Sequence, residues 1–230
     1  MKIKIYVLQV LICSFLNANV ISSGVWQITY NIGTASAVNL KNNTKIIIYK
    51  DKNTKTDAAK NNGYWMEEKF QLLSVVSKYV SFQRTFYSEG GAHPSYGKEF
   101  RTVDLDKNGT TVSLKNIFTD KDLFEALMKD KIISTHLSNS PSSLDGLFNV
   151  INGGCEMDLS ETMLNSFGFH HVNSDSIAIR IGIGSGCETD RGKFIQIGIY
   201  LPIPPQLKDA FVKAEAVGSL MDKLIQQGKK

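Results

Sequence analysis

The clearest hydropathy pattern in the chain is the alternation between Lys78 and Ser88. One face of this segment is predominantly apolar, and it consists of Val80, Phe82, Arg84 and Phe86. A period of two residues is typical of a β-strand with one buried face. Alternation, or enrichment in β-branched and aromatic residues, predicts further strands at residues 25–32, 44–50, 64–76, 100–105, 167–172, 177–183 and 194–201.

Apolar residues at helical spacing predict three helices. The first follows Thr119 or Asp120 as its cap and runs to about residue 139, and the second covers residues 144–151. The third is a C-terminal amphipathic helix marked by Leu207, Phe211, Ala214 and Val217. The polar stretch 51–63 and the stretch 184–192 are interpreted as loops. The order of these predicted strands and helices along the chain indicates an antiparallel sheet followed by helices.

The N-terminus predicts export. Lys2 and Lys4 precede an apolar run of about a dozen residues, Ile5 to Leu16, which matches a signal peptide and is too short to span a bilayer. Residues 1–22 are therefore interpreted as a signal peptide, with cleavage after Ala18 or Ser22. A buried core strand is the alternative. Because the large Ile12 precedes Cys13, no lipid anchor is expected, and the mature protein is expected to be periplasmic or secreted, with no membrane span.

Export leaves two cysteines, Cys155 and Cys187, and an even count in an exported chain indicates a disulfide. The alternative is two unrelated buried thiols. Neither cysteine has a second cysteine or a histidine at zinc-site spacing, so a structural zinc site is not expected.

Composition excludes some partners. The 230-residue chain has a formal net charge of +4. Loss of Lys2 and Lys4 leaves +2, since 4 − 2 = 2. Basic and aromatic residues are not concentrated in one stripe, so nucleic acid is not the expected partner. After the signal peptide, the expected units are residues 23–63 with strands and a polar loop, a main domain at 64–212, and a C-terminal helix and tail at 213–230.

Residues 86–96 form the most constrained stretch. Gly90 and Gly91 permit positive φ angles, and Pro94 pushes His93 toward an extended conformation. The sequence predicts a rigid corner that displays His93. This histidine could be a metal ligand or a general base, and the simpler interpretation is a structural corner.

The other histidines have simpler interpretations. His136 lies near a predicted helix end, where a capping role is expected. His170 and His171 are adjacent in a predicted strand, where their side chains are expected on opposite faces and unable to share a metal.

The corner and the segment after it carry a family resemblance. The run Val80-Ser81-Phe82, followed by Tyr87-Ser88-Glu89-Gly90-Gly91-Ala92-His93-Pro94, resembles the central motif of the RsiV-type extracytoplasmic domain. The segment Val112-Ser113-Leu114-Lys115-Asn116-Ile117-Phe118 resembles the family's strand-to-helix segment. The resemblance implies an α+β fold, an antiparallel β-sheet with helices packed on one face. It also implies a non-catalytic domain of the cell envelope that binds a lysozyme-like protein or peptidoglycan.

Two predicted loops supply the expected binding residues, since aromatic and arginine side chains commonly anchor interfaces and acidic ones complement a basic lysozyme. These residues are Tyr87, Glu89, His93, Tyr96, Glu188, Asp190 and Arg191. No cofactor and no catalytic motif are expected. The alternative function is an envelope hydrolase, with or without a metal, that uses His93 with nearby carboxylates.

Overall fold

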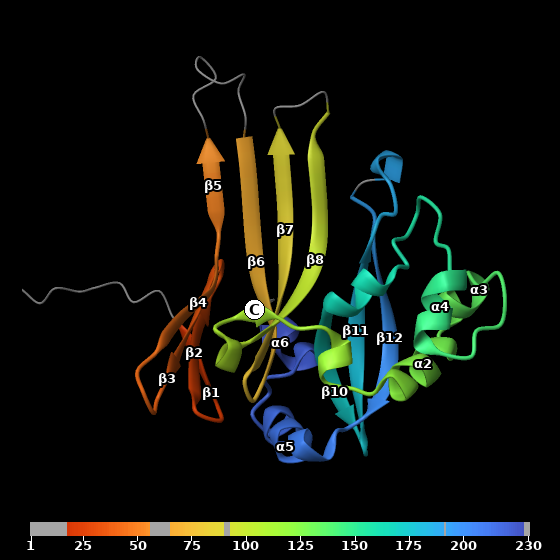
Figure 1. The fold of residues 1–230 in the computed structure, drawn as a ribbon. Coiled ribbons are helices and arrows are strands. Elements are labelled where there is room, and N and C mark those ends of the chain that lie inside the picture. The colour runs from red at the N-terminus through yellow and green to blue at the C-terminus, as the bar shows by residue number, and fades with distance from the viewer. Residues whose placement is uncertain (1–17, 56–64, 90–92, 191, 228–230) are drawn as a thin grey trace, which may run out of the picture.

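The computed structural model describes residues 18–55, 65–89, 93–190 and 192–227. Figure 1 shows their arrangement. The strands are β1 (Asn19–Ser23), β2 (Trp26–Asn31), β3 (Thr34–Asn39), β4 (Lys45–Lys50), β5 (Lys52–Lys55), β6 (Trp65–Val76), β7 (Tyr79–Glu89), β8 (Ser95–Asp104), β9 (Thr110–Thr111), β10 (Phe167–Asn173), β11 (Ser176–Gly184) and β12 (Phe194–Pro202). The α-helices are α2 (Asp120–Met128), α3 (Lys131–Thr135), α4 (Leu144–Val150), α5 (Lys208–Ala216) and α6 (Met221–Gln227).

The described strands form three sheets rather than one, and within each sheet every strand pairs antiparallel with the next strand in sequence. The orders are β1-β2-β3-β4, β5-β6-β7-β8-β9 and β10-β11-β12. Antiparallel sheets with a few helices agree with the predicted α+β class. Packing of the helices on one face is not confirmed, because α2 lies against β12 whereas α5 and α6 lie against β10 and β6.

The first sheet contains two strands that the sequence pattern did not predict. β1 pairs along its whole length with β2, from Asn19 opposite Tyr30 to Ser23 opposite Trp26. β3 is built from small residues, and only Ala35 and Ala37 point into the core. Alanine and serine carry little strand preference, so pairing with β2 and β4, not local propensity, makes this segment a strand.

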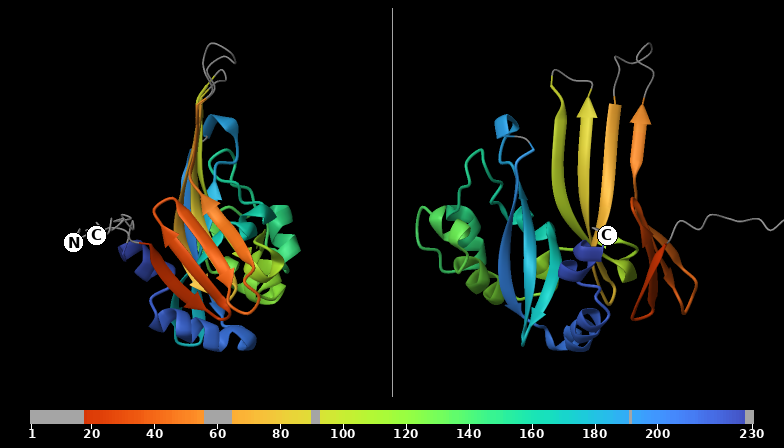
Figure 2. Two further views of the ribbon diagram at one scale, coloured as in Figure 1. Left: turned by 90° about the vertical axis from the view of Figure 1, so that its left-hand side faces the viewer. Right: turned by 180° about the vertical axis from the view of Figure 1, so that it is seen from behind.

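The second sheet is the tallest part of the molecule. In both views of Figure 2 the upper ends of β5 to β8 extend beyond the other elements. β5 falls in the stretch 51–63 that was expected to be a loop, and it pairs with the start of β6. β8 begins at Ser95, five residues before the predicted start at Phe100, because Ser95 to Gly97 pair with the upper end of β7. The predicted glycine corner at 90–92 lies outside the described residues.

The third sheet provides one face of the main hydrophobic core. The odd-numbered isoleucines of β11, from Ile177 to Ile183, are essentially inaccessible and pack with Leu123, Leu127 and Leu147 of the helices. Phe169 of β10 stacks edge-on against Phe211 of α5, with ring centroids 5.1 Å apart. α5 therefore closes this core rather than forming a separate tail.

The expected single helix at 119–139 is two helices. Thr119 caps α2, as predicted, by accepting a hydrogen bond from the Asp122 amide. Asp130 then interrupts the helix, because its carboxylate accepts from the amides of Ile132 and Ile133 at 2.8 and 3.1 Å and so starts α3. An aspartate at this position caps a new helix more readily than it continues an old one.

Small polar side chains join the second and third sheets. The Thr102 hydroxyl of β8 donates to the Phe167 carbonyl of β10 at 2.7 Å and lies 2.8 Å from the Ser81 hydroxyl of β7. Ser74 of β6 accepts from the Phe169 amide at 3.3 Å. Because Ser74, Ser81 and Thr102 are completely buried, each of these bonds satisfies a group that has no access to water.

We predict that Thr102→Val lowers the free energy of unfolding by about 1–3 kcal/mol, because the Phe167 carbonyl loses its donor inside the protein. Thr102→Ser keeps the hydroxyl and is expected to lose less. Thr111→Val in the exposed strand β9 is the matched control and is expected to stay near wild type. Chemical denaturation measures all three. Equal stability of Thr102→Val and wild type would contradict the prediction.

We also predict that export processing leaves Asn19 as the mature N-terminus, without a lipid. Cleavage after Ser22 would remove four of the five residues of β1 and their pairing with β2, whereas cleavage after Ala18 leaves the strand whole. Intact-mass measurement of the exported protein distinguishes the two positions. A mature chain starting at Ser23, or a diacylglyceryl group on Cys13, would show the prediction to be wrong.

Candidate functional site

The predicted binding residues lie at the upper ends of two sheets. Tyr87 and Glu89 end β7, and Tyr96 lies at the start of β8 just after the exposed His93. Asp190 belongs to a short 3-10 helix, Glu188–Asp190, in the loop between β11 and β12. Arg191 and the side chain of Glu188 lie outside what the structure describes.

Tyr96 brings the two predicted loops together. Its ring lies directly against Gly192, where a Cβ atom would overlap the ring carbons. Gly192 also has a φ of +83°, a conformation that side-chain-bearing residues resist. Glycine is therefore required here for two reasons, and the β11–β12 loop rests on the start of β8.

Below this contact lies an open groove between β8 on one side and the third sheet on the other. Its volume is about 630 Å³. Residues from both sides line the groove, among them Tyr96, Lys98, Arg101, Asp158, Ser166 and Lys193. Concave sites of this size accommodate small-molecule ligands. The groove is therefore the candidate binding site.

The backbone of β8 forms one wall of the groove. β7 pairs with β8 along its other side, and β9 covers only Val103 and Asp104. The Phe100 amide points away from β7 and donates to the Ser166 hydroxyl at 3.2 Å. Because outward-pointing backbone groups alternate along a strand, those of Tyr96 and Lys98 also face the groove. A ligand in the groove can form backbone hydrogen bonds there.

The charged lining is slightly basic. Three cationic residues, Lys98, Arg101 and Lys193, face two acidic ones, Glu99 and Asp158. The Lys98 ammonium lies 5.5 Å from the centre of the Phe194 ring and, within the described residues, has no carboxylate partner. A cation held by an aromatic ring rather than by an acid remains available to an anionic ligand.

The other groove cations are already paired with carboxylates. Lys193 lies 2.9 Å from Asp190 and 3.6 Å from Glu156, and its hydrogen bond to Asp190 is the main cause of its raised pKa. Arg101 lies 2.7 Å from Glu99. Lys98 is therefore the groove cation with the least compensation.

Two of the predicted acidic residues are engaged within the protein. Glu89 accepts a hydrogen bond from the Tyr87 hydroxyl at 2.9 Å, and this bond is the main cause of the raised Tyr87 pKa. Asp190 pairs with Lys193. The Lys193 ammonium offsets the charge of Asp190, whereas the neutral Tyr87 hydroxyl offsets none of the charge of Glu89.

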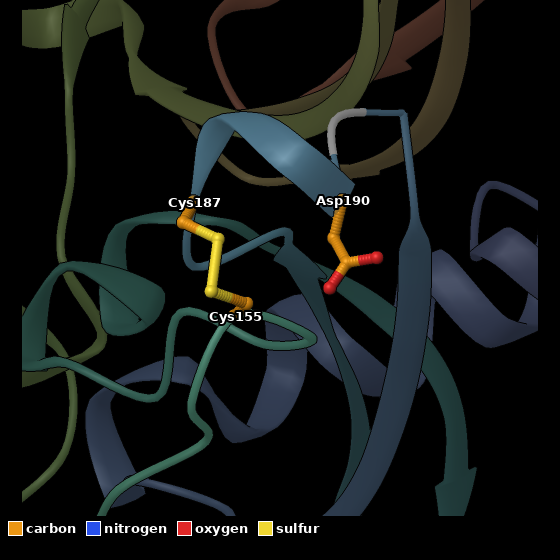
Figure 3. A group of neighbouring side chains, drawn as sticks. All are labelled: Cys155, Cys187 and Asp190. Atoms are coloured by element: carbon orange, nitrogen blue, oxygen red, sulfur yellow. A yellow bond between two sulfur atoms is a disulfide. The ribbon is translucent and has the colours of Figure 1, made fainter.

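A disulfide lies beside the groove and anchors the same β11–β12 loop that carries Gly192. The sulfurs of Cys155 and Cys187 lie 2.22 Å apart, at bonding distance, as the predicted pairing requires (Figure 3). Backbone hydrogen bonds support the same junction, from Gly186 to Cys155 and from Asp158 to Gly184, each 2.9 Å. Asp158 and Gly184 both line the groove, so the disulfide holds two loops that shape it.

The described residues contain one cluster of three potential metal-ligating side chains. It consists of Cys155, Cys187 and Asp190, whose ligand atoms lie within 4.8 Å of one another. Figure 3 shows that both sulfurs are used by the disulfide, so they are not free thiolates. His93 is not part of this cluster.

For the remaining histidines, the structure confirms the expectation for His136 and corrects the one for His170 and His171. His136 ends α3, and its Nδ1 lies 2.8 Å from the Ile132 carbonyl, as expected for a residue at a helix end. The expectation that His170 and His171 point to opposite faces is wrong. Their Nδ1 atoms lie 2.7 Å apart, because a β-bulge shifts the register between Phe169 and His171.

No pattern in the sequence marked these groove residues: Lys98, Asp158, Ser166 and Lys193. Lys98 could have been found if β8 had been predicted from Ser95, since Tyr96 and Lys98 then share one face of a strand. The other three come from different elements, and no local pattern connects them to β8.

Comparison with protein-family models, with curated proteins and with solved structures gives no match to this chain. Among the described residues, no helix has the length and apolar character needed to cross a membrane.

We predict that reducing the Cys155–Cys187 disulfide lowers the free energy of unfolding by about 3–4 kcal/mol, because the bond closes a loop of about thirty residues in the unfolded chain. Denaturation with and without reductant measures the change. A Cys155→Ser, Cys187→Ser variant is the control and should not respond to reductant. Two freely alkylated thiols in the native, unreduced protein would refute the pairing.

Proposed function

We propose that this protein is an exported, non-catalytic binding domain of the cell envelope and that it holds a peptidoglycan fragment in the β8 groove. The observation that carries the proposal is the groove itself: a concave, polar site beside an open strand edge, with one weakly compensated cation. The envelope location and the two ligand classes come from the RsiV-type resemblance.

The groove chemistry suits a sugar chain that carries short peptides. Tyr96 is 52% exposed and offers an aromatic ring for stacking against a sugar. The backbone groups of Tyr96 and Lys98 can pair with an extended peptide. The Lys98 ammonium can pair with the terminal carboxylate of such a peptide. These contacts come from Tyr96 and Lys98, which are two residues apart on the same strand, so a single extended ligand reaches them all.

A disulfide supports the proposed compartment. Disulfides persist in the oxidising environment outside the cytoplasm, and the Cys155–Cys187 bond shapes the groove wall. A domain that uses this groove is therefore expected to work in the periplasm or outside the cell.

Peptidoglycan is favoured over a lysozyme-like protein on two grounds. The site is concave, whereas an interface with a globular protein needs a larger and flatter surface. Asp190, which was expected to attract a basic lysozyme, is already paired with Lys193. Peptidoglycan is therefore the proposed ligand, and the experiment below also tests a lysozyme-like partner.

The test is titration of the purified mature protein with soluble peptidoglycan fragments, together with co-sedimentation with isolated peptidoglycan. Tyr96→Ala and Lys98→Ala are expected to weaken binding by about tenfold each, since residues of this kind at a site centre contribute more than 1 kcal/mol. Tyr200→Ala and Lys121→Ala are matched controls, because both residues are exposed and neither lines the groove. The controls are expected to bind like wild type.

Four results would overturn the proposal. Absence of saturable binding to fragments and to isolated peptidoglycan would remove the ligand. Binding that survives both Tyr96→Ala and Lys98→Ala would place the site elsewhere. Binding to lysozyme alone, reduced by Glu89→Gln and Asp190→Asn, would favour the protein partner. Release of soluble fragments by wild type but not by His93→Ala would establish the hydrolase alternative instead.

A further inference from the structure

His170 and His171 form a converging pair on the third sheet. Their Nδ1 atoms lie 2.7 Å apart, and their rings meet edge to face with centroids 4.9 Å apart. Both side chains are half-buried. Neither lines the groove, so the pair is separate from the proposed binding site.

The β-bulge creates this pair. Phe169 lies opposite Ile179 and His171 lies opposite Ala178, so His170 is an extra residue with no partner on β11. In a regular strand, adjacent side chains alternate between faces, and a bulge disrupts that alternation. Bulges commonly re-aim a side chain toward a functional position.

The histidine pair lies beside an exposed residue of the third sheet. Tyr200 lies beside His171, with ring centroids 5.9 Å apart, and is 53% exposed. Ala178, the partner of both His171 and Tyr200, is small and leaves room above the sheet. The two imidazoles are therefore reachable from the side that faces away from the isoleucine core.

The nitrogen spacing is close to that of two ligands on one metal ion. Zinc binds histidine nitrogen at about 2.0–2.1 Å, so two imidazoles at tetrahedral or square-planar angles place their nitrogens roughly 2.9–3.4 Å apart. The observed 2.7 Å needs only a small opening of the pair. Without a metal, this contact requires one nitrogen to donate and the other to accept, which a doubly protonated pair cannot do.

Burial and the charged groups around His170 lower its pKa. Burial lowers the pKa of His170, and Arg180 and His171 lower it further, whereas Asp222 of α6 acts in the opposite direction. Glu215 of α5 is occupied by the Val172 amide, 3.1 Å away. Neutral imidazole is the form that binds metals, and a lowered pKa of His170 is compatible with that role.

Asp222 supplies a further polar group near the pair. Its Oδ1 atom is buried and has no hydrogen-bond partner among the described residues. Its side chain retains 21% exposure, and Lys223 lies 3.6 Å from its other oxygen. A buried carboxylate oxygen without a donor is a feature that a nearby cation or its bound water can satisfy.

We propose that His170 and His171 bind one divalent transition-metal ion through their Nδ1 atoms, with water completing the coordination. The expected ions are Cu²⁺, Ni²⁺ and Zn²⁺, which prefer imidazole over the all-oxygen sets chosen by Mg²⁺ and Ca²⁺. Two protein ligands give a site of modest affinity, open on the solvent side.

The test is calorimetric titration of the intact mature protein with Cu²⁺ and, separately, with Zn²⁺. One equivalent per chain is expected, with Cu²⁺ bound more tightly in accordance with the general order of divalent affinities. His170→Gln and His171→Gln are expected to weaken binding on the order of tenfold each, and the double variant is expected to abolish it. His136→Gln and His93→Gln are the matched controls and are expected to bind like wild type.

Electron paramagnetic resonance of the Cu²⁺ complex provides a second readout. Coupling to two equivalent imidazole nitrogens is expected in the wild type and to one in each single variant. Circular dichroism verifies that the variants keep the wild-type fold. The proposal is overturned if the wild type shows no saturable binding, or if a folded double variant binds Cu²⁺ as tightly as wild type.

Discussion

The hydrogen bond from the Thr102 hydroxyl to the Phe167 carbonyl is the constraint on which the arrangement of the sheets depends. It joins β8 to β10 inside the protein, where neither group can turn to water instead. Ser81 shares the same hydroxyl, and Ser74 repeats the connection to Phe169. Apolar side chains could bury the same area, but they would not fix the two strands at one position relative to each other. These three small polar residues do.

That position determines the groove. β8 pairs with β7 along one side, and β9 covers only Val103 and Asp104 on the other, so the edge from Tyr96 to Phe100 has no strand partner among the described residues. The β11–β12 loop closes the top, where Tyr96 lies on Gly192. The disulfide anchors the same loop, through Cys187, to the segment that carries Cys155. A strand edge that is free but sheltered is less prone to uncontrolled pairing than one fully open to solvent.

The histidine pair shows how one extra residue changes the chemistry of a strand. Adjacent residues normally point to opposite faces, and the sequence of β10 gives no sign that it departs from this rule. The bulge at Phe169 and His171 brings two imidazoles to one side of the sheet, next to Tyr200. The isoleucines of β11 keep their regular alternation, so the core on the other side is undisturbed.

The sequence alone determined most elements and the cysteine pairing, because these depend on local periodicity and on a count of two. It also placed Tyr96 among the expected binding residues, and Tyr96 lines the groove. Only the tertiary structure decided the division into three sheets, the strand at Ala35 and Ala37, and the meeting of Lys98, Asp158 and Lys193 around one groove. The bulge at His170 is likewise a feature that only the tertiary structure decided. In each case the decisive contact joins residues far apart along the chain or depends on the register of a partner strand, and neither leaves a pattern in a single segment.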